Sequence, residues 1–331
     1  MSKSNRVKCL IIITLAAAFI SGTLFGCEKQ GQPAQQPMFT SLQDIPGITD
    51  DEINAIETLR EQKTSFVYGM CPSTETFYNT NNEIGGFTVL FCEWLTKLFG
   101  IPFEPAIYER GDLIDGLESG AIDFTGELTP NDERSMAYIM TDAIAARMIK
   151  AFRVTDSPPL EEVGLERPLR LAFLKNTTTI NKVTPHLNFD YEISYADDYA
   201  VVYNMFSDGT IDVFFDEGPA EAAFDFYGDI TSEDFFPRAY DPVSLSTQNP
   251  DFAVIISVVQ KTLENGSIRT LNELYNQGYN EYKRHRLFLR LTGRERAYLN
   301  THTVIPFAAE FDNYPKSFYN INEKEWQCLA N

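Results

Sequence analysis

Short apolar runs alternate with amphipathic helical patterns along most of the chain. The runs at 65–70, 101–107, 169–174 and 191–195 have the length and the aromatic or branched content of strands. Helical patterns separate them, and the longest of these ends at Phe99. Because strands that alternate with helices usually form a mainly parallel sheet, the pattern predicts an α/β protein.

One stretch, 122–134 (IDFTGELTPNDER), combines a strand end, a polar turn and a helix start. Gly126 and Pro130 punctuate the apolar run, and Asn131 can cap a new helix that carries Arg134 in its first turn. Hydroxyl, backbone N–H and guanidinium groups would then converge at one place, which suits a carboxylate or another small anion. On this stretch alone, an ordinary βα connection with a surface arginine remains the alternative.

The segment Thr129-Pro130-Asn131-Asp132-Glu133-Arg134 resembles the Thr-x-Thr-x-x-Arg segment of the family 3 extracellular solute-binding proteins, the amino-acid-binding type. Further segments resemble those of the same family in the same order; they are 85–95, 141–144, 175–179 and 209–219. The resemblance spans about residues 64–284, and its strength lies in the order and spacing of segments that are individually weak.

The resemblance implies an α/β, two-lobed, periplasmic-binding-protein-like (type II) fold with a ligand cleft between the lobes. The solute-binding domain would cover 48–290. Lobe one would hold about 60–150 and 242–285, and lobe two about 153–240. Two strands would cross between the lobes, and 148–154 and 241–247 are the expected crossings.

The family's carboxylate site maps onto four residues of this chain. Arg134 and Thr129 would bind the ligand's α-carboxylate from lobe one, and the turn with Thr177 and Thr178 would bind it from lobe two. A purely structural Ser/Thr turn is the alternative for Thr177 and Thr178.

The family's ammonium site maps onto an acid pair. Counting from Asp212 without a gap favours Glu217 over Asp216, which would point to the other face of a continuing strand. A solvated acid pair at a strand end is the alternative. The family often stacks an aromatic side chain on the ligand, and Phe77 or Tyr78 would do so here unless both only cover the edge of the lobe.

Glu127 departs from the family, which usually has Gly, Ser or Ala at this position. Either Glu127 pairs with Arg134 and weakens the carboxylate site, or it binds a second cationic group on the ligand. We favour a ligand with an extra amine. Some relatives of this fold, the cyclohexadienyl dehydratases, use an acid in the cleft as a catalyst, so Glu127 leaves a minor enzymatic alternative. We expect no enzyme and no catalytic residue.

The N-terminus has the pattern of an export signal. Basic residues precede a short apolar run at 9–20, and Gly26-Cys27 resembles the end of a bacterial lipobox. We therefore expect a lipoprotein signal peptide over 1–26, lipidation at Cys27 and a flexible tether over 27–47. The alternative is an uncleaved anchor with Cys27 an incidental thiol, and both place the remainder outside the cytoplasm.

Composition excludes several function classes. The net charge of −20 argues against nucleic acid as a partner and against membrane contact other than through the N-terminal anchor. His186, His285 and His302 lack the spacing of a metal site, and no phosphate-binding or nucleophile motif occurs. We expect no cofactor and no metal, and a small solute as the ligand.

Residues 291–331 repeat the start of the domain. Thr292-Gly293-Arg294-Glu295 has the spacing of a capping box, as Thr49-Asp50-Asp51-Glu52 has. The stretch 313–318 resembles the loop that opens a solute-binding domain, and 325–329 resembles the segment that follows it, with Cys328 where Gly is usual. We interpret 291–331 as the truncated start of a second domain, of the kind found in tandem in Venus-flytrap sensor histidine kinases. Two roles follow: an extracytoplasmic receptor for an ABC-type permease, or a truncated ectodomain of a sensor kinase.

Overall fold

The computed structural model describes residues 39–175, 177–302, 304, 312–313, 317–320 and 325–328. The proposed signal peptide, Cys27 and most of the tether lie outside these residues. The chain divides into two units, Met1–Tyr279 and Asn280–Asn331. None of the helices in the described part combines the length and apolar character needed to cross a bilayer.

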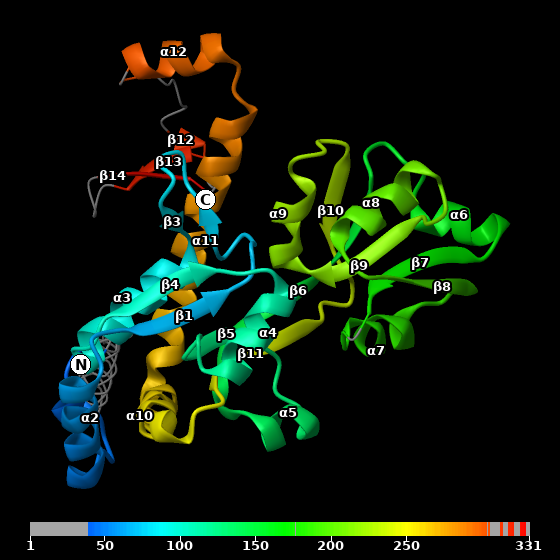
Figure 1. The fold of residues 1–331 in the computed structure, drawn as a ribbon. Helices are drawn as coiled ribbons and strands as arrows, with labels where there is room; N and C mark the ends of the chain where they lie inside the picture. The colour runs from blue at the N-terminus through cyan, green and yellow to red at the C-terminus, as the bar shows by residue number, and fades with distance from the viewer. Residues whose placement is uncertain are drawn as a thin grey trace, which may run out of the picture. The chain divides into compact units, whose positions relative to one another are not determined.

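The first unit alternates strands and helices, as the sequence predicts (Figure 1). Its first elements are η1 (Leu42–Asp44), α2 (Asp50–Gln62), β1 (Phe66–Met70), β2 (Phe77–Tyr78), β3 (Ile84–Gly85), α3 (Phe87–Phe99), β4 (Phe103–Ile107), α4 (Arg110–Ser119), β5 (Phe124–Leu128), α5 (Asp132–Ala137) and β6 (Ile139–Val154). There follow α6 (Leu160–Glu166), β7 (Leu169–Leu174), α7 (Thr179–Val183), η2 (Thr184–His186), β8 (Tyr191–Ala196), α8 (Tyr199–Ser207), β9 (Val213–Glu217), η3 (Gly218–Ala220), α9 (Glu221–Phe224) and β10 (Ile230–Asp234). The unit closes with β11 (Tyr240–Thr247), η4 (Pro250–Phe252), α10 (Ala253–Thr262), η5 (Leu263–Ser267) and α11 (Ile268–Arg290), which continues into the second unit.

Two strands join two lobes. In lobe one the strand order is β4-β1-β5-β11-β6, with β4 and β5 parallel to β1 and with β11 antiparallel to β5 and to β6. In lobe two the order is β6-β9-β7-β8, and β10 also pairs with β6. The 16-residue β6 belongs to both, because residues 139–148 pair with β11 and residues 149–154 pair with β9 and β10 (Figure 1). The expected crossing strand at 148–154 is therefore the second half of a longer strand, and β10 was not predicted.

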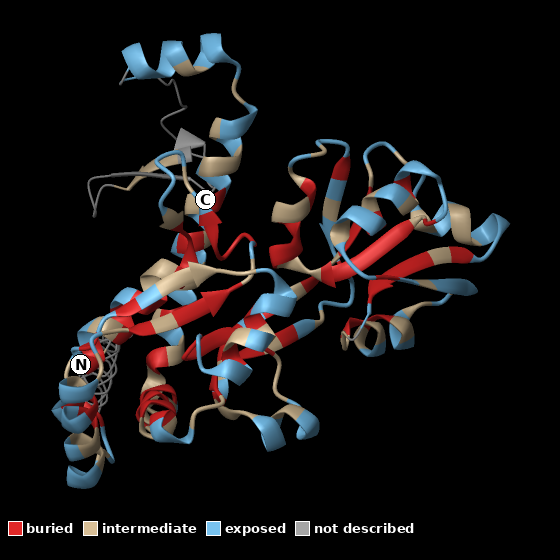
Figure 2. Cartoon of the chain, in the orientation of Figure 1, coloured by how far each residue is buried: buried red, intermediate tan, exposed pale blue. Residues whose placement is uncertain are grey.

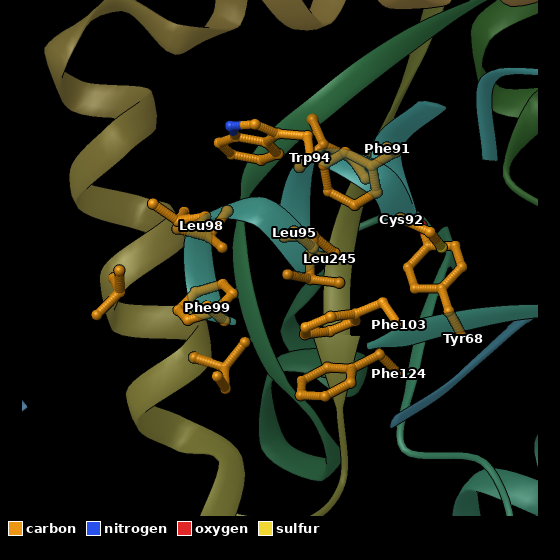
Figure 3. Packing of buried hydrophobic residues seen from close by; sticks show 14 of the residues in the cluster. Tyr68, Phe91, Cys92, Trp94, Leu95, Leu98, Phe99, Phe103, Phe124 and Leu245 are labelled. Carbon is orange, nitrogen blue, oxygen red and sulfur yellow. The ribbon is translucent and has the colours of Figure 1, made fainter. Parts of the chain in front are cut away.

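Lobe one is held by an aromatic core (Figure 3). In α3 the buried side chains Phe91, Trp94, Leu95 and Leu98 recur three and four residues apart, so they form one face that packs on the sheet. Gly100, with φ of +65°, ends this helix in the left-handed conformation. The burial of these large side chains fixes the sheet whose strand ends carry the site.

Strand β9 of lobe two is buried along most of its length (Figure 2). Adjacent Phe214 and Phe215 on β9 belong to different core clusters, because successive side chains of a strand point to opposite faces. Phe214 packs with Phe152 and Phe224, and Phe215 packs with Phe173 and Phe235. A strand anchored on both faces holds the two acids that follow Phe215 firmly in place.

The second unit contains α12 (Gly293–Thr301) and an antiparallel sheet of β12 (Asp312–Asn313), β13 (Ser317–Asn320) and β14 (Glu325–Cys328). Thr292 and Glu295 form the expected capping box. The β13–β14 hairpin repeats β2–β3: Phe318-Tyr319-Asn320 matches Phe77-Tyr78-Asn79, and Tyr319 pairs with Trp326 as Tyr78 pairs with Ile84. In this register Cys328 corresponds to Gly86, which agrees with the resemblance found in the sequence.

Candidate ligand-binding site

A cavity of about 540 Å³ is lined by both lobes at the carboxyl ends of their strands. Its size is within the range of small-molecule sites, and open α/β folds bind ligands at such strand ends. The charged and hydroxyl-bearing residues on its wall are Ser73, Glu109, Arg110, Glu127, Thr129, Arg134, Tyr138, Arg147, Thr177, Thr178, Asp197, Asp198, Tyr199, Asp216 and Glu217.

Arg134 lies on the lobe-one wall without a carboxylate partner among the described residues. The side chain of Asn131 caps α5 by accepting a hydrogen bond from the Arg134 N–H at 2.8 Å, and Nη1 of Arg134 donates to the carbonyl of Thr129 at 2.9 Å. Partial burial and the nearby charge of Arg110 lower the pKa of Arg134. A bound anion would relieve both effects, so this wall is suited to a carboxylate.

Arg147, on β6, is the most heavily bonded charge of the cavity. Its Nε and Nη2 donate to the two oxygens of Glu75 at 2.9 and 2.7 Å, and its Nη1 donates to Glu127 and to Glu217, each at 2.9 Å. Glu75 also accepts a hydrogen bond of 2.7 Å from the hydroxyl of Tyr275. Glu75 and Glu127 belong to lobe one and Glu217 to lobe two, so one buried guanidinium connects the carboxylates of both lobes.

Glu127 does not pair with Arg134. One of its oxygens accepts from Arg147, and the other accepts from the N–H of Cys71 at 3.0 Å. The roles expected for Glu127 from the sequence are a bond to Arg134 or a bond to a second cationic group on the ligand. The structure shows a third arrangement, a bond to Arg147, which no local pattern indicates because Arg147 lies 20 residues away in sequence.

The acid pair lies at the end of β9, and both of its side chains line the cavity. Asp216 accepts from the Tyr199 hydroxyl at 3.1 Å and from the N–H of Glu217 at 2.9 Å, yet its burial outweighs these bonds and raises its pKa to about 6. Burial likewise raises the pKa of Glu217 to about 7, although Arg147 acts to lower it. Both carboxylates would gain from a nearby positive charge.

Comparison with known proteins finds similarity in fold but no match to a family model or to a curated protein. Among solved structures, the periplasmic VFT2 domain of BvgS from Bordetella pertussis is similar with a TM-score of 0.55 at 15% identity, over 68% of this chain and 97% of that chain. The fold is the two-lobed, type II periplasmic-binding-protein-like fold.

Two binding proteins are also similar to this chain. One is AbpA from Streptococcus pneumoniae, an amino acid ABC transporter substrate-binding protein bound to L-arginine, with a TM-score of 0.51 at 14% identity over 68% of this chain and 98% of that chain. The other is the ancestral amino acid-binding protein AncCDT-1, described as a precursor of cyclohexadienyl dehydratase, with a TM-score of 0.50 at 16% identity over 68% of this chain and 99% of that chain.

Within this periplasmic-binding-protein-like fold, Thr129, Thr177 and Thr178 all line the cleft. The hydroxyl of Thr177 donates to the carbonyl of Leu174 at 2.9 Å, and that of Thr178 donates to Asp241 at 3.4 Å. Their hydroxyl hydrogens are therefore directed at protein acceptors, so these two hydroxyls can serve a ligand only as hydrogen-bond acceptors unless they rotate.

Phe77 and Tyr78 do not line the cavity of this fold. Phe77 is buried in the β2–β3 hairpin, and Tyr78 is exposed. The aromatic side chains on the wall are Tyr138 and Tyr199 instead. Tyr199 begins α8 directly after its capping residue Asp198.

The structure adds Glu75, Arg110 and Arg147 to the site residues named from sequence. A signal for Arg147 existed, because it is a lone charge within the apolar run 143–149 on a crossing strand. Among the described residues, no group of three or more His, Cys, Asp or Glu side chains is arranged to hold a metal ion.

Proposed function

We propose that this chain binds a small amino-acid-like zwitterion in the cleft between its lobes. The observation that carries the proposal is the opposition of Arg134, which has no carboxylate partner among the described residues, and the acids Asp216 and Glu217, whose pKa values are raised. The two sides are close enough for the charge of Glu217 to act on the pKa of Arg134. A ligand with one carboxylate and one ammonium would complement both.

The test is calorimetric titration of the protein with a panel of amino acids, amines and short peptides. For any ligand that binds, Arg134→Ala should weaken affinity at least tenfold, about 1.4 kcal/mol. Arg238→Ala is the matched control, because Arg238 is exposed and lies outside the cavity wall. An affinity that stays within about twofold in Arg134→Ala would show that the carboxylate site has been misplaced.

We favour capture of the solute for an ABC-type permease, on the basis of the lipobox-like Gly26-Cys27. The alternative role is ligand sensing for a histidine kinase. The repeat of the β2–β3 hairpin at β13–β14 and the likeness to the BvgS domain support it. Genes next to this one distinguish the roles, since a permease and an ATPase accompany transport and a kinase accompanies sensing.

Incorporation of labelled palmitate that is lost in Cys27→Ser, and kept in Cys9→Ser, tests the anchor and the extracytoplasmic location.

The dehydratase alternative depends on Glu127 as a proton donor to the ligand. Both oxygens of Glu127 already accept hydrogen bonds from protein donors, one of them a guanidinium. This arrangement favours binding without catalysis. Incubation with prephenate and arogenate tests the alternative, and turnover of either would establish an enzyme.

A further inference from the structure

The carboxylates around Arg147 have the geometry of a guanidinium-binding cage. Glu75 supplies a two-oxygen fork to Nε and Nη2, the arrangement that recognises a guanidinium most specifically. Glu127 and Glu217 complete the cage at Nη1. If a ligand's cationic side chain entered the cleft, these three acids would be its natural partners, but the chain's own arginine occupies them.

Arg147 cannot easily leave this position. Its side chain is only 4% exposed, and its backbone lies in the middle of β6, paired with Asp241 of β11. Displacing the guanidinium would leave three acids together at the centre of the fold with no compensating charge. A ligand must therefore bind to what Arg147 leaves available.

Arg147 leaves other charged groups of the cavity wall available to a ligand. They can bind an ammonium group and carboxylate groups. Oε1 of Glu217 accepts no hydrogen bond from the described residues, and the 23% exposed Glu217 side chain borders the cavity. On the opposite wall Arg134 and Arg110 carry no ion pair with any described acid, and the charge of Arg110 acts on the pKa of Arg134. Glu109 and Asp198 also line the cavity without an ion pair to any described cation, but the group of three carboxylates that could enclose a guanidinium is already occupied by Arg147. The cleft thus offers two cations for ligand carboxylates and no unused carboxylate cage for a cationic side chain.

We propose that Arg147 is a specificity-determining residue that fills the cleft's guanidinium cage with the chain's own side chain and so excludes amino acids with cationic side chains. The ligand is then an amino acid with a neutral or acidic side chain. This inference rests on the proposed function, and it replaces the extra-amine ligand favoured from sequence. It also separates this chain from AbpA, which is described as bound to L-arginine.

The first experiment titrates the wild-type protein with arginine, lysine, glutamine and glutamate. We expect arginine and lysine to bind at least tenfold more weakly than the better of the other two. Arginine or lysine binding as tightly as glutamine or glutamate would overturn the inference and leave the proposed function standing. If no amino acid of the full panel binds, the proposed function fails, and the cage is decided by the second experiment.

The second experiment removes the guanidinium of Arg147 by mutation and supplies a free guanidinium compound in its place. Arg147→Ala should be stabilised by millimolar methylguanidinium, seen as a rise of several degrees in melting temperature, whereas the wild type should not. Arg153→Ala is the matched control, because Arg153 is a buried arginine of the same strand that bonds Glu233 and the Ser157 and Pro158 carbonyls outside the cavity. Methylammonium, which lacks the planar fork, should have a smaller effect.

Every outcome of the refilling experiment is decisive. If Arg147→Ala folds only when methylguanidinium is present, recorded by circular dichroism after refolding, the cage is supported. If methylguanidinium neither raises the melting temperature of a folded variant nor restores the fold of an unfolded one, the three acids are not a guanidinium cage and the inference is overturned.

Discussion

Glu75 and Arg147 are 72 residues apart in sequence, yet the carboxylate of Glu75 accepts two parallel hydrogen bonds from the guanidinium of Arg147, at 2.9 and 2.7 Å. Both side chains are 4% exposed. A buried ion pair loses most when one partner is removed, because the other then keeps its desolvation cost without its bond. The contact therefore fixes the loop after β1 to the strand that crosses between the lobes.

We predict that Glu75→Gln lowers the free energy of unfolding by about 2 kcal/mol, the order of one charge-assisted bond within a buried group. The loss is less than that for a removed Arg147, because Glu127 and Glu217 still neutralise the guanidinium. Urea unfolding followed by circular dichroism measures the change.

Glu57→Gln is the control for Glu75→Gln. Glu57 pairs with Arg60 three residues away, but its side chain is 53% exposed, so the expected loss is below about 0.5 kcal/mol. Equal losses in the two variants would contradict the view that the buried cluster holds the lobes.

Gly278 is predicted to be required by a close approach between α11 and the start of α3. A Cβ built at Gly278 would lie 2.2 Å from the backbone nitrogen of Phe87 and 2.6 Å from its Cα. Backbone atoms cannot move aside as a side-chain end can, so Gly278→Ala should destabilise the protein by about 1–3 kcal/mol. Urea unfolding again measures the difference from wild type.

A gain in stability, not a loss, is expected for Gly111→Ala in α4. Nothing lies within 4 Å of a Cβ at Gly111, and alanine in a helix is more stable than glycine by about 0.5–1 kcal/mol. If both variants gained stability, helix propensity alone would govern Gly278 and the close packing against Phe87 would be absent.

The sequence predicted elements well where hydrophobic period and local caps decide them. The capping box of Thr49 and Glu52 begins α2 as expected, and the capping box of Thr292 and Glu295 begins α12 as expected. The sequence pattern did not predict β10, because Ile230–Asp234 is polar and its strand conformation comes from pairing with β6. Strand pairing of that kind is a tertiary effect that no local pattern contains.

The sequence pointed to residues that line one cavity, and it did not point to Arg147. Motif spacing brought Arg134 and Glu217 to the same cavity, because strand ends and helix starts are local features. Arg147 was missed because its partners lie 72, 20 and 70 residues away, and only the completed fold brings three acids to one guanidinium. For the same reason, the sequence did not show that Glu127 is already bonded to Arg147.

The last prediction concerns the pH dependence of stability through Glu217. Burial raises the pKa of Glu217 from its ordinary 4.5 to about 7, so between these values the folded state keeps a proton that the unfolded state has lost. Stability from this group is complete below pH 4.5 and decreases as the pH rises through 7. Glutamine imitates the protonated form at every pH. Glu217→Gln should therefore match the wild type near pH 4.5 and exceed it at pH 8, by on the order of 3 kcal/mol at ~1.4 kcal/mol per pKa unit. Melting temperatures of both proteins from pH 4.5 to 8 measure the difference.

Glu52→Gln provides a control of opposite sign. Burial acts to raise the pKa of Glu52, but the hydrogen bonds from Lys261, the Thr49 N–H and Ser257 outweigh it and lower the pKa to about 2. Ionised Glu52 thus stabilises the fold above pH 4.5, and this contribution disappears as the pH falls towards 2. Glu52→Gln should be less stable than wild type at pH 7, with a deficit that shrinks on acidification. If Glu217→Gln also lost stability relative to wild type as the pH rose, ionised Glu217 would be a net stabilising partner of Arg147, and the cost of burying its charge would be smaller than proposed.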